Sequence, residues 1–349
     1  MSRPETGGRR KPAKIADVAR IAEVSVATVS RTLANPEVVA EETRKRVLAA
    51  VTATGYTPNL AGRALRARRS MLALVVVPDL ANPFFPEVLR GVDETLSAAG
   101  YGIIIANLDN SAEKESRYVD LACAGQVDGV LLLCGHVIRG RVRDLRASGL
   151  PIVAACERID GEDIPQVEVD NEDAAARAVA HLIDLGHRRI GYIAGPERNV
   201  LDRDRRKGFG RALRAARLDP RKAPAFAGDF TFRAGERAAR DWLAMPDATR
   251  PSAIFAANDE MAIGFVKTAR AAGARVPDDV SIVGFDGIEF ADYCEPTLTT
   301  IYQPRRDIGA TAAALLIAAM TSPKPPSPRF ERIATRLMLR DSTAAAPKR

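Results

Sequence analysis

Residues 14–35 read Lys14-Ile-Ala-Asp-Val-Ala-Arg-Ile-Ala-Glu-Val-Ser-Val-Ala-Thr-Val-Ser-Arg-Thr-Leu-Ala-Asn35. Between Ile15 and Ala22, apolar residues recur at the spacing of one helical face, which predicts a short helix. A tight break follows at Glu23-Val24. Ser25 is then a suitable cap for a second helix, because its hydroxyl can accept a hydrogen bond from an amide of the first turn. The stretch therefore predicts two short helices joined by a turn.

The second helix should bury Val29 and Leu33 and present its other face to the surroundings. An exposed arginine on such a face can donate to both acceptors of a guanine edge, and small apolar side chains suit a thymine methyl group. Hydroxyl side chains are suited to phosphates. The candidate DNA-binding residues are Val26, Ala27, Thr28, Ser30 and Arg31. Spacing alone is equally compatible with an ordinary helical hairpin at the start of a globular domain.

The residues of this region resemble the DNA-binding headpiece of the LacI/GalR family of bacterial transcriptional regulators. The resemblance lies in residues 15–19, 24–31, 35–36, 41–44 and 55–59 and continues through nearly the whole chain. It implies a helix-turn-helix domain over residues 14–57, with a third helix near 41–54. Glu23 departs from the family pattern, because many members have Gly or Asn there and a positive φ would be strained. Ala40 replaces a common Ser cap, at a cost of ~1 kcal/mol.

The net charge of +7 is concentrated at the start of the chain. Residues 1–70 hold 14 basic and 6 acidic residues, whereas the remainder holds 37 basic and 38 acidic residues. Such a local excess is the electrostatic footprint expected of a phosphate-binding surface. A basic disordered tail, predicted for residues 1–13, explains Arg9-Arg10-Lys11 but not the periodic stretch that follows. The expected partner is double-stranded operator DNA.

Cysteine and histidine are sparse, with four and three residues respectively. The cysteines are scattered without a CxxC pair, which fits a reduced cytoplasm better than a disulfide framework. The spacing of His181 and His187 does not suit joint metal binding. We expect no metal, no cofactor, no secretion signal and no membrane span, since the longest apolar run, residues 312–320, is too short.

Residues 58–70 form a connector with helical residues but also Gly62, and short isolated helices are marginal in water. We expect a hinge that becomes helical on DNA. The family resemblance implies that Leu65 wedges between base pairs in the minor groove, a known way to kink DNA. A passive linker is the alternative.

From Leu72 onward, apolar strand-like runs alternate with helical segments of ten or more residues. This alternation predicts doubly wound parallel sheets covered on both faces. A near-repeat between residues 128–153 and 251–283 predicts two similar lobes, about 71–165 and 166–300. A return segment over 300–342, with a late strand at 329–339, completes an effector-binding and dimerisation core over 71–342, and residues 343–349 form a tail. The expected strands cover 72–77, 102–107, 129–134, 151–156, 189–194, 253–257 and 281–285. The expected helices cover 84–99, 112–126, 172–185, 204–216, 234–244 and 260–272.

The core resembles the periplasmic-binding-protein fold that the family carries behind its headpiece, and ligands of such sheets sit at the carboxyl ends of the strands. Arg, Asp, Asn and Gln side chains suit a polyhydroxylated ring, and Phe offers a flat apolar face. The resemblance implies an effector pocket lined by Phe84, Phe85, Arg205, Phe230, Asn258, Asp286 and Gln303. Taken singly, each could instead be a cap, a turn or a core residue. Cys156-Glu157 stands where many sugar-binding members have Asp, so we expect no conventional ligand contact there.

We therefore predict a cytoplasmic repressor, not an enzyme, that binds a near-palindromic operator as a homodimer under control of a small effector. Residues 228–232, 290–300 and 303–305 are especially similar to nucleoside-responsive members of the family. Sugar-responsive members, however, share much of this sequence. One alternative is a periplasmic-type solute-binding protein without a regulatory role. Another is a nucleotide-dependent enzyme, for which the only near match to a dinucleotide-binding loop is Gly208-Phe-Gly210, which lacks the third glycine and lies in a predicted helix.

Overall fold

The computed structural model describes residues 13–56, 69–109, 111–141, 144–322 and 330–347. The chain divides into two compact units, Met1–Arg69 and Ser70–Arg349, which we call the headpiece and the core. The predicted disordered tail, most of the hinge and Leu65 lie outside the described residues.

The headpiece contains the three helices that the sequence predicts, α1 (Ile15–Ile21), α2 (Val26–Ala34) and α3 (Glu41–Thr54), with a 3-10 turn η1 (Pro36–Val38) between the last two. The Ser25 hydroxyl caps α2, accepting from the Thr28 amide at 3.1 Å. One residue from each helix, Val18, Val29 and Val47, is fully buried in their shared apolar cluster. This small core fixes the α1–turn–α2 unit, because each helix alone is too short to be stable.

The turn between α1 and α2 has the strained backbone that the sequence predicts. Glu23 adopts a φ of 53°, in the left-handed region that favours glycine. Arg46 of α3 stabilises this turn: its guanidinium donates to the carbonyl of Ala22 at 2.6 Å and to that of Glu23 at 3.2 Å. Ala40 provides no side-chain cap for α3, also as predicted.

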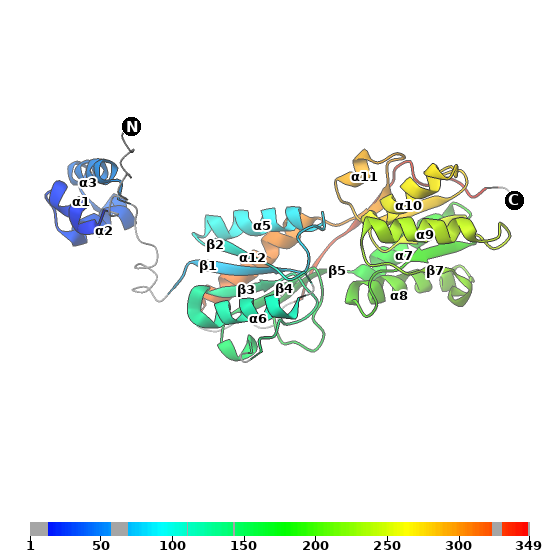
Figure 1. Ribbon diagram of the computed structural model, residues 1–349, viewed down its shortest axis with the longest axis horizontal. Helices are drawn as coiled ribbons and strands as arrows, with labels where there is room; N and C mark the ends of the chain where they lie inside the picture. Colours follow the sequence, from blue (N-terminus) through cyan, green and yellow to red (C-terminus); the bar gives the residue numbers. More distant parts are fainter. Residues whose placement is uncertain (1–12, 57–68, 110, 142–143, 323–329, 348–349) are drawn as a thin grey trace, which may run out of the picture. The chain divides into compact units, whose positions relative to one another are not determined.

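The first sheet of the core has the order β11-β5-β4-β3-β1-β2, and all of its strand pairs are parallel. Alternate residues of β1 point to opposite faces: Val75 packs in the cluster with α5 and α12, whereas Val76 packs in the cluster with α6. Helices thus cover both faces (Figure 1). Its elements are β1 (Leu72–Val77), α5 (Phe85–Ala98), β2 (Gly102–Asn107), α6 (Ala112–Leu121), the π-helical turn η2 (Ala122–Gln126), β3 (Gly129–Leu132), the 3-10 turn η3 (Arg146–Ser148), β4 (Ile152–Ala155), β5 (Gln166–Val169), α12 (Arg305–Thr321) and β11 (Phe330–Ile333).

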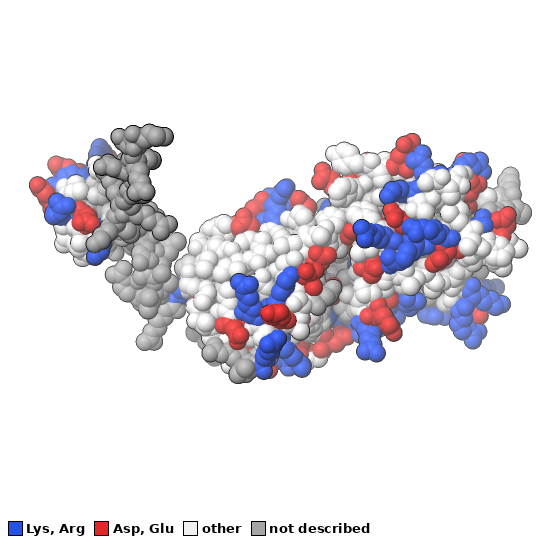
Figure 2. All heavy atoms as spheres, in the orientation of Figure 1, with Lys and Arg blue, Asp and Glu red and all other residues white. Residues whose placement is uncertain are grey.

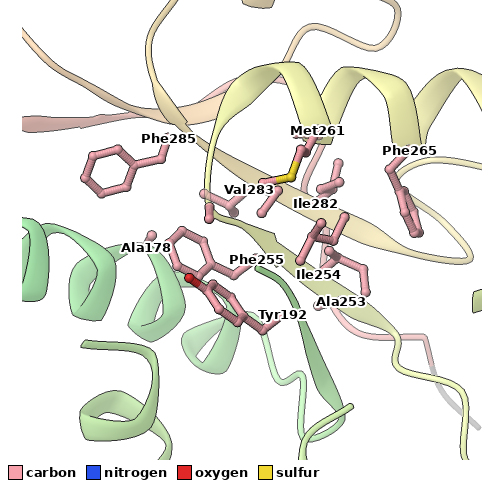
Figure 3. Packing of buried hydrophobic residues seen from close by; sticks show 14 of the residues in the cluster. Ala178, Tyr192, Ala253, Ile254, Phe255, Met261, Phe265, Ile282, Val283 and Phe285 are labelled. Atoms are coloured by element: carbon pink, nitrogen blue, oxygen red, sulfur yellow. The ribbon is translucent and has the colours of Figure 1, made fainter. Parts of the chain in front are cut away.

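The second sheet has the order β12-β10-β9-β8-β6-β7, parallel except for the β10–β12 pair. Figure 3 shows its core: Tyr192 and Phe255 stack at 5.6 Å between ring centroids, and Met261 and Phe265 of α10 cover the other side. Its elements are α7 (Asn171–Asp184), β6 (Ile190–Ile193), α8 (Val200–Ala215), the 3-10 turn η4 (Pro220–Lys222), β7 (Ala225–Phe226), α9 (Phe232–Ala244), β8 (Ala253–Ala256), α10 (Asp259–Ala271), β9 (Ser281–Asp286), α11 (Phe290–Tyr293), β10 (Thr299–Tyr302) and β12 (Arg336–Met338).

Glycine pairs allow two helix pairs to approach closely, one pair in each lobe. A Cβ on Gly91 of α5 would lie 2.0 Å from the Arg306 carbonyl oxygen, and one on Gly309 of α12 would lie 2.0 Å from that of Val88. Gly235 of α9 and Gly264 of α10 make the same reciprocal contact. Each lobe therefore contains one such glycine-mediated helix contact.

Three details of the predicted lobe organisation are wrong. The first lobe does not end at residue 165, because β5 pairs with β4 in the first sheet. The return segment contains a helix, α12, that packs in the first lobe and was not predicted. The single late strand at 329–339 is two strands, β11 in the first sheet and β12 in the second. The chain thus passes between the lobes at residues 170, 303–304 and 334–335.

The described part of the predicted tail, residues 343–347, is bound to the second lobe. The Ala346 amide donates to the Leu185 carbonyl at 2.8 Å. The buried imidazole of His187 contacts the hydroxyls of Ser252 and Ser281 at 2.9 and 3.1 Å, and the carbonyl of Ala344 at 3.1 Å. His187, whose spacing from His181 does not suit joint metal binding, therefore has a structural role. Its hydrogen bonds hold the chain end against β8 and β9.

His187 should make the stability of the core depend on pH. Burial lowers the pKa of His187, so its stabilising contribution is complete above the unfolded value, about 6.5, and is lost as pH falls below it. His187→Gln should lower the free energy of unfolding by about 1–3 kcal/mol at pH 7.5. The wild-type advantage should shrink towards pH 5.5 in urea unfolding followed by circular dichroism. An advantage that stays constant over this range would contradict the assignment.

Candidate functional site

The exposed face of α2 carries four of the five described residues predicted to bind DNA. Val26 is 44% exposed although it is apolar, and Ala27, Ser30 and Arg31 are also exposed. Thr28 is half-buried, because its hydroxyl lies 2.9 Å from that of Ser25 within the helix cap. The side chain of Arg31 makes no hydrogen bond or ion pair within the described part of the headpiece. An unpaired guanidinium beside small apolar groups matches the predicted major-groove surface.

A cavity of about 1270 Å³ in the core is lined by residues of both lobes. It lies at the carboxyl ends of strands, where ligands of parallel sheets bind. Asp79 follows β1 and Cys156-Glu157 follow β4, whereas Phe230 follows β7 and Asn258 follows β8. All seven predicted effector residues line this one cavity: Phe84, Phe85, Arg205, Phe230, Asn258, Asp286 and Gln303.

Arg205 of α8 lines this cavity and is only 2% exposed. Its guanidinium donates to the Asn171 side-chain oxygen at 2.9 Å and to the Ala257 carbonyl, and stacks 3.8 Å from the Phe285 ring centroid. Burial lowers the pKa of Arg205, an effect that the carboxylate of Asp286, 3.6 Å away, opposes. Asn171, which was not predicted, thus orients a predicted residue.

Asp286 ends β9 with a φ of 118°, a backbone strain typical of functional positions. Its side chain accepts from the Gln303 amide nitrogen at 2.8 Å, and its carbonyl accepts from the Gln303 backbone amide at 3.1 Å. Burial raises the pKa of Asp286 to about 6, although the Arg205 charge and the Gln303 hydrogen bond oppose the rise. Arg205, Asp286 and Gln303 therefore form one connected polar group.

Asn258 caps α10, accepting from the Met261 amide at 3.1 Å, and also donates to the Phe230 carbonyl at 2.9 Å. The alternative role of a helix cap and the predicted place on the cavity are thus both correct. Phe230 has a φ of 67°, which directs its ring against Gly195. Phe84 and Phe85 meet edge to face, with ring centroids 5.4 Å apart. These rings supply the flat apolar surfaces of the cavity.

Polar contacts join the two lobes along one side of the cavity. Glu157, after β4, accepts from the side-chain amide of Asn199, the cap of α8, at 3.3 Å. Arg203 of α8 pairs with Asp160 at 2.8 Å, and Arg158 pairs with Asp204 at 3.1 Å. Burial raises the pKa of Glu157 against its bonds to Asn199 and the Gly135 backbone. These pairs leave no local pattern in the sequence, because the partners lie more than forty positions apart.

The core lacks the basic excess that residues 1–70 carry. On the face shown in Figure 2, basic and acidic side chains of the core lie interspersed. Among the described residues, no group of three or more His, Cys, Asp or Glu could hold a metal ion. No helix within the described ranges is long and apolar enough to cross a membrane.

A helix-turn-helix headpiece followed by a two-lobed α/β core with an internal cavity is the architecture of ligand-controlled DNA-binding regulators. The model of the bacterial regulatory proteins of the lacI family matches residues 14–59, and that of the periplasmic binding protein-like domain matches residues 179–343. The HTH-type transcriptional repressor CytR of Escherichia coli (strain K12) is 39% identical over 337 residues, which are 96% of this chain and 97% of that protein. The chain therefore belongs to the lacI family of bacterial regulatory proteins.

Solved structures support the same relationship. The lac repressor dimer bound to operator and the anti-inducer ONPF matches with a TM-score of 0.82 and 27% identity, over 96% of this chain and 100% of that one. The complex of the transcriptional regulator CelR with cellobiose matches with a TM-score of 0.71 and 32% identity, over 95% and 99% of the two chains. The fold class predicted from the sequence is confirmed.

Removing the buried guanidinium of Arg205 should lower the free energy of unfolding of the core far more than removing that of Arg206. Arg205→Ala leaves the buried Asp286 without its positively charged partner and should cost about 3–5 kcal/mol of core stability. Arg206→Ala, which removes a half-exposed guanidinium paired with Asp202, should cost about 1 kcal/mol or less. Urea unfolding of the two variants provides the measurement, and equal losses would contradict the assigned role.

Proposed function

We propose that this chain is a transcriptional repressor that binds a near-palindromic operator as a homodimer. A small sugar or nucleoside bound in the inter-lobe cavity sets its affinity for the operator. The observation that carries the proposal is that one chain combines an exposed, unpaired α2 surface with a cavity lined by both lobes. A ligand that contacts both lobes can favour one relative arrangement of them, and such a change is a means of control.

The headpiece supplies the sequence-reading surface. We infer that α2 enters the major groove, with Arg31 donating to a guanine and Val26 and Ala27 meeting thymine methyl groups. Thr28 and Ser30 are assigned to phosphates. Leu65 is proposed as a minor-groove wedge on the basis of the family resemblance alone, because it lies outside the described residues.

The cavity suits an uncharged ligand rich in hydroxyl groups. Arg205, Asn258, Asp286 and Gln303 offer convergent donors and acceptors, and Phe84, Phe85 and Phe230 offer apolar ring faces. Such a combination fixes the orientation of a sugar or nucleoside by polar contacts and holds it by stacking. The similarity to CytR favours a nucleoside, and the cellobiose complex of CelR keeps a sugar in consideration.

Exposed apolar groups on the core support a dimer. Phe290 and Tyr293 of α11 are 53% and 78% exposed, and Ile105 is 39% exposed on the edge strand β2. Exposed apolar patches and uncovered strand edges are features that a second subunit commonly covers. The match to the lac repressor dimer supports the same assembly.

We propose a binding protein rather than an enzyme, acting in the cytoplasm, where its operator lies. The relatives that support this choice are repressors. The match of residues 14–59 to a DNA-binding family favours this function over that of a periplasmic-type solute-binding protein. The incomplete match to a dinucleotide-binding loop at residues 208–210 lies inside α8 rather than in a loop, which disfavours a nucleotide-dependent enzyme.

Arg31 should carry sequence recognition. An operator obtained by selection from a random duplex library should bind Arg31→Ala more weakly by about 1–3 kcal/mol per half-site, because a bidentate contact to guanine is lost. Fluorescence anisotropy at several salt concentrations measures this loss and should show steeply salt-dependent binding for the wild type.

Arg221→Ala is the matched control, since it removes the same charge from an exposed position of the core. It should leave operator affinity unchanged. Equal effects of the two substitutions would mean that Arg31 contributes only general charge, and salt-independent or absent duplex binding would contradict the proposed function itself.

A further inference from the structure

A second cavity, of about 930 Å³, lies in the second lobe between α8 and the edge strand β7 (Figure 1). Two carboxyl groups line it, those of Glu197 and Asp202. Six cationic side chains line it: Arg198, Arg203, Arg206, Lys207, Arg214 and Arg221. Because residues 71–349 together carry no basic excess, this cavity concentrates positive charge locally, which favours an anionic occupant.

Two of these cations, Arg198 and Arg214, have no acidic partner among the described residues. The guanidinium of Arg214 lies back along α8, because Gly210 leaves it room: a Cβ at that position would lie 3.2 Å from its Nη1 atom. The carboxyl group of Asp202 is already occupied, since it accepts from a tyrosine hydroxyl and from a backbone amide at 2.7 Å each. The cavity therefore keeps positive charge that ion pairs within the described chain do not neutralise.

The cations of α8 are spread along the helix rather than gathered at one point. From Arg203 to Arg214 the helix axis rises about 16 Å, at about 1.5 Å per residue. An extended chain covers this length in about five residues. A single phosphate or carboxylate group would instead be held by convergent donors. The wall formed by α8 therefore suits several anionic groups carried along an extended chain.

The opposite wall is the edge strand β7, which pairs with β6 on one side only. The carbonyls of Pro224 and Phe226 accept from β6 amides at 2.9 Å each. Because successive backbone groups of a strand point to opposite sides, those of Ala225 and Ala227 point away from β6. Both alanines are exposed and line the cavity, and their outward backbone groups have no hydrogen-bond partner within the described ranges. An unpaired strand edge thus borders the same cavity as the cationic side chains.

These two features together favour one kind of occupant. A strand edge with unpaired amides and carbonyls is a template for an additional extended chain. Cationic side chains beside the edge select a chain that carries carboxylates. A solvated basic surface or a site for a small anion would account for the arginines, but not for an unpaired strand edge in the same cavity.

We propose that this cavity docks an extended, acidic segment of a partner protein, which adds a strand to the edge of β7 and places its carboxylates against α8. The proposal does not depend on the ligand of the inter-lobe cavity or on operator DNA. Residues 197–199 line both cavities. A docked segment therefore lies beside the loop that carries Asn199, whose side chain donates to Glu157 of the first lobe.

Fluorescence anisotropy of dye-labelled peptides with the full chain tests the proposal. A hexapeptide that alternates glutamate and valine should bind about tenfold more tightly than its lysine–valine counterpart, because like charges repel. Rising salt concentration should weaken its binding. Methylation of its backbone nitrogens should weaken it by about tenfold, because hydrogen bonds to β7 are lost. Nuclear magnetic resonance should show slower hydrogen exchange at the amides of Ala225 and Ala227 when the peptide is bound.

Arg214→Glu should weaken binding of the acidic peptide by about tenfold or more. Arg233→Glu reverses the charge of an exposed residue of α9 outside this cavity and is the matched control, with binding unchanged. Urea unfolding should show that both variants keep the stability of the wild type.

Several results would overturn the proposal. Equal or absent binding of the two peptides, or binding that survives in Arg214→Glu, would refute the assigned surface. Tripolyphosphate that binds as tightly as the acidic peptide, with no effect of backbone methylation, would indicate a site for small anions. Protection of the two alanine amides that rises with protein concentration, before any peptide is added, would indicate that a second copy of the chain covers the edge.

Discussion

The Arg205 guanidinium is enclosed by the second lobe, so its charge must be balanced inside the protein. Burying an ion without partners is costly, and the surrounding residues are arranged to avoid that cost. Asn171, the Ala257 carbonyl and Asp286 face its nitrogens, and Phe285 lies against its plane. These partners come from α7 and from the ends of β8 and β9, so the charge aligns several elements at the edge of the sheet where the cavity opens.

The same constraint connects the lobes. Asp286, held by Arg205, also binds Gln303, which stands where the chain leaves the second sheet for α12 of the first lobe. Arg305, two residues later, donates to the Gly287 carbonyl at 2.8 Å. Asp286 lines the cavity and lies next to a point where the chain crosses between the lobes. A ligand that contacts Asp286 therefore acts beside this crossing. This arrangement allows a ligand in the cavity to bias the relative arrangement of the two lobes, as ligand-driven population shifts require.

Much of this organisation could be predicted from the sequence because it depends on local patterns. Apolar runs such as residues 72–77 and 102–107 gave strands with the observed bounds, and Ser25 and Gly55 marked helix ends. Strand β5 was missed because its residues, Gln-Val-Glu-Val, alternate in polarity although all four are buried. The double crossing at residues 303–335 was missed because pairing between distant segments leaves no local signal.

The residues of the cavity also include some that could be predicted from the sequence and some that could not. Its seven predicted residues came from the family resemblance and from their positions after strands. Glu157, Asn171 and Asn199 were not predicted as site residues, because each depends on a partner that only the folded chain reveals.

The proposed function requires that operator binding by the headpiece and ligand binding in the cavity be energetically linked. The most direct measurement is the dissociation constant of the selected operator duplex with and without a saturating metabolite that binds the core, together with that of the metabolite with and without operator. We predict that each ligand changes the affinity of the other by the same factor, about 5–150-fold. Two ligands that both bind, but whose affinities are independent of each other, would contradict the account.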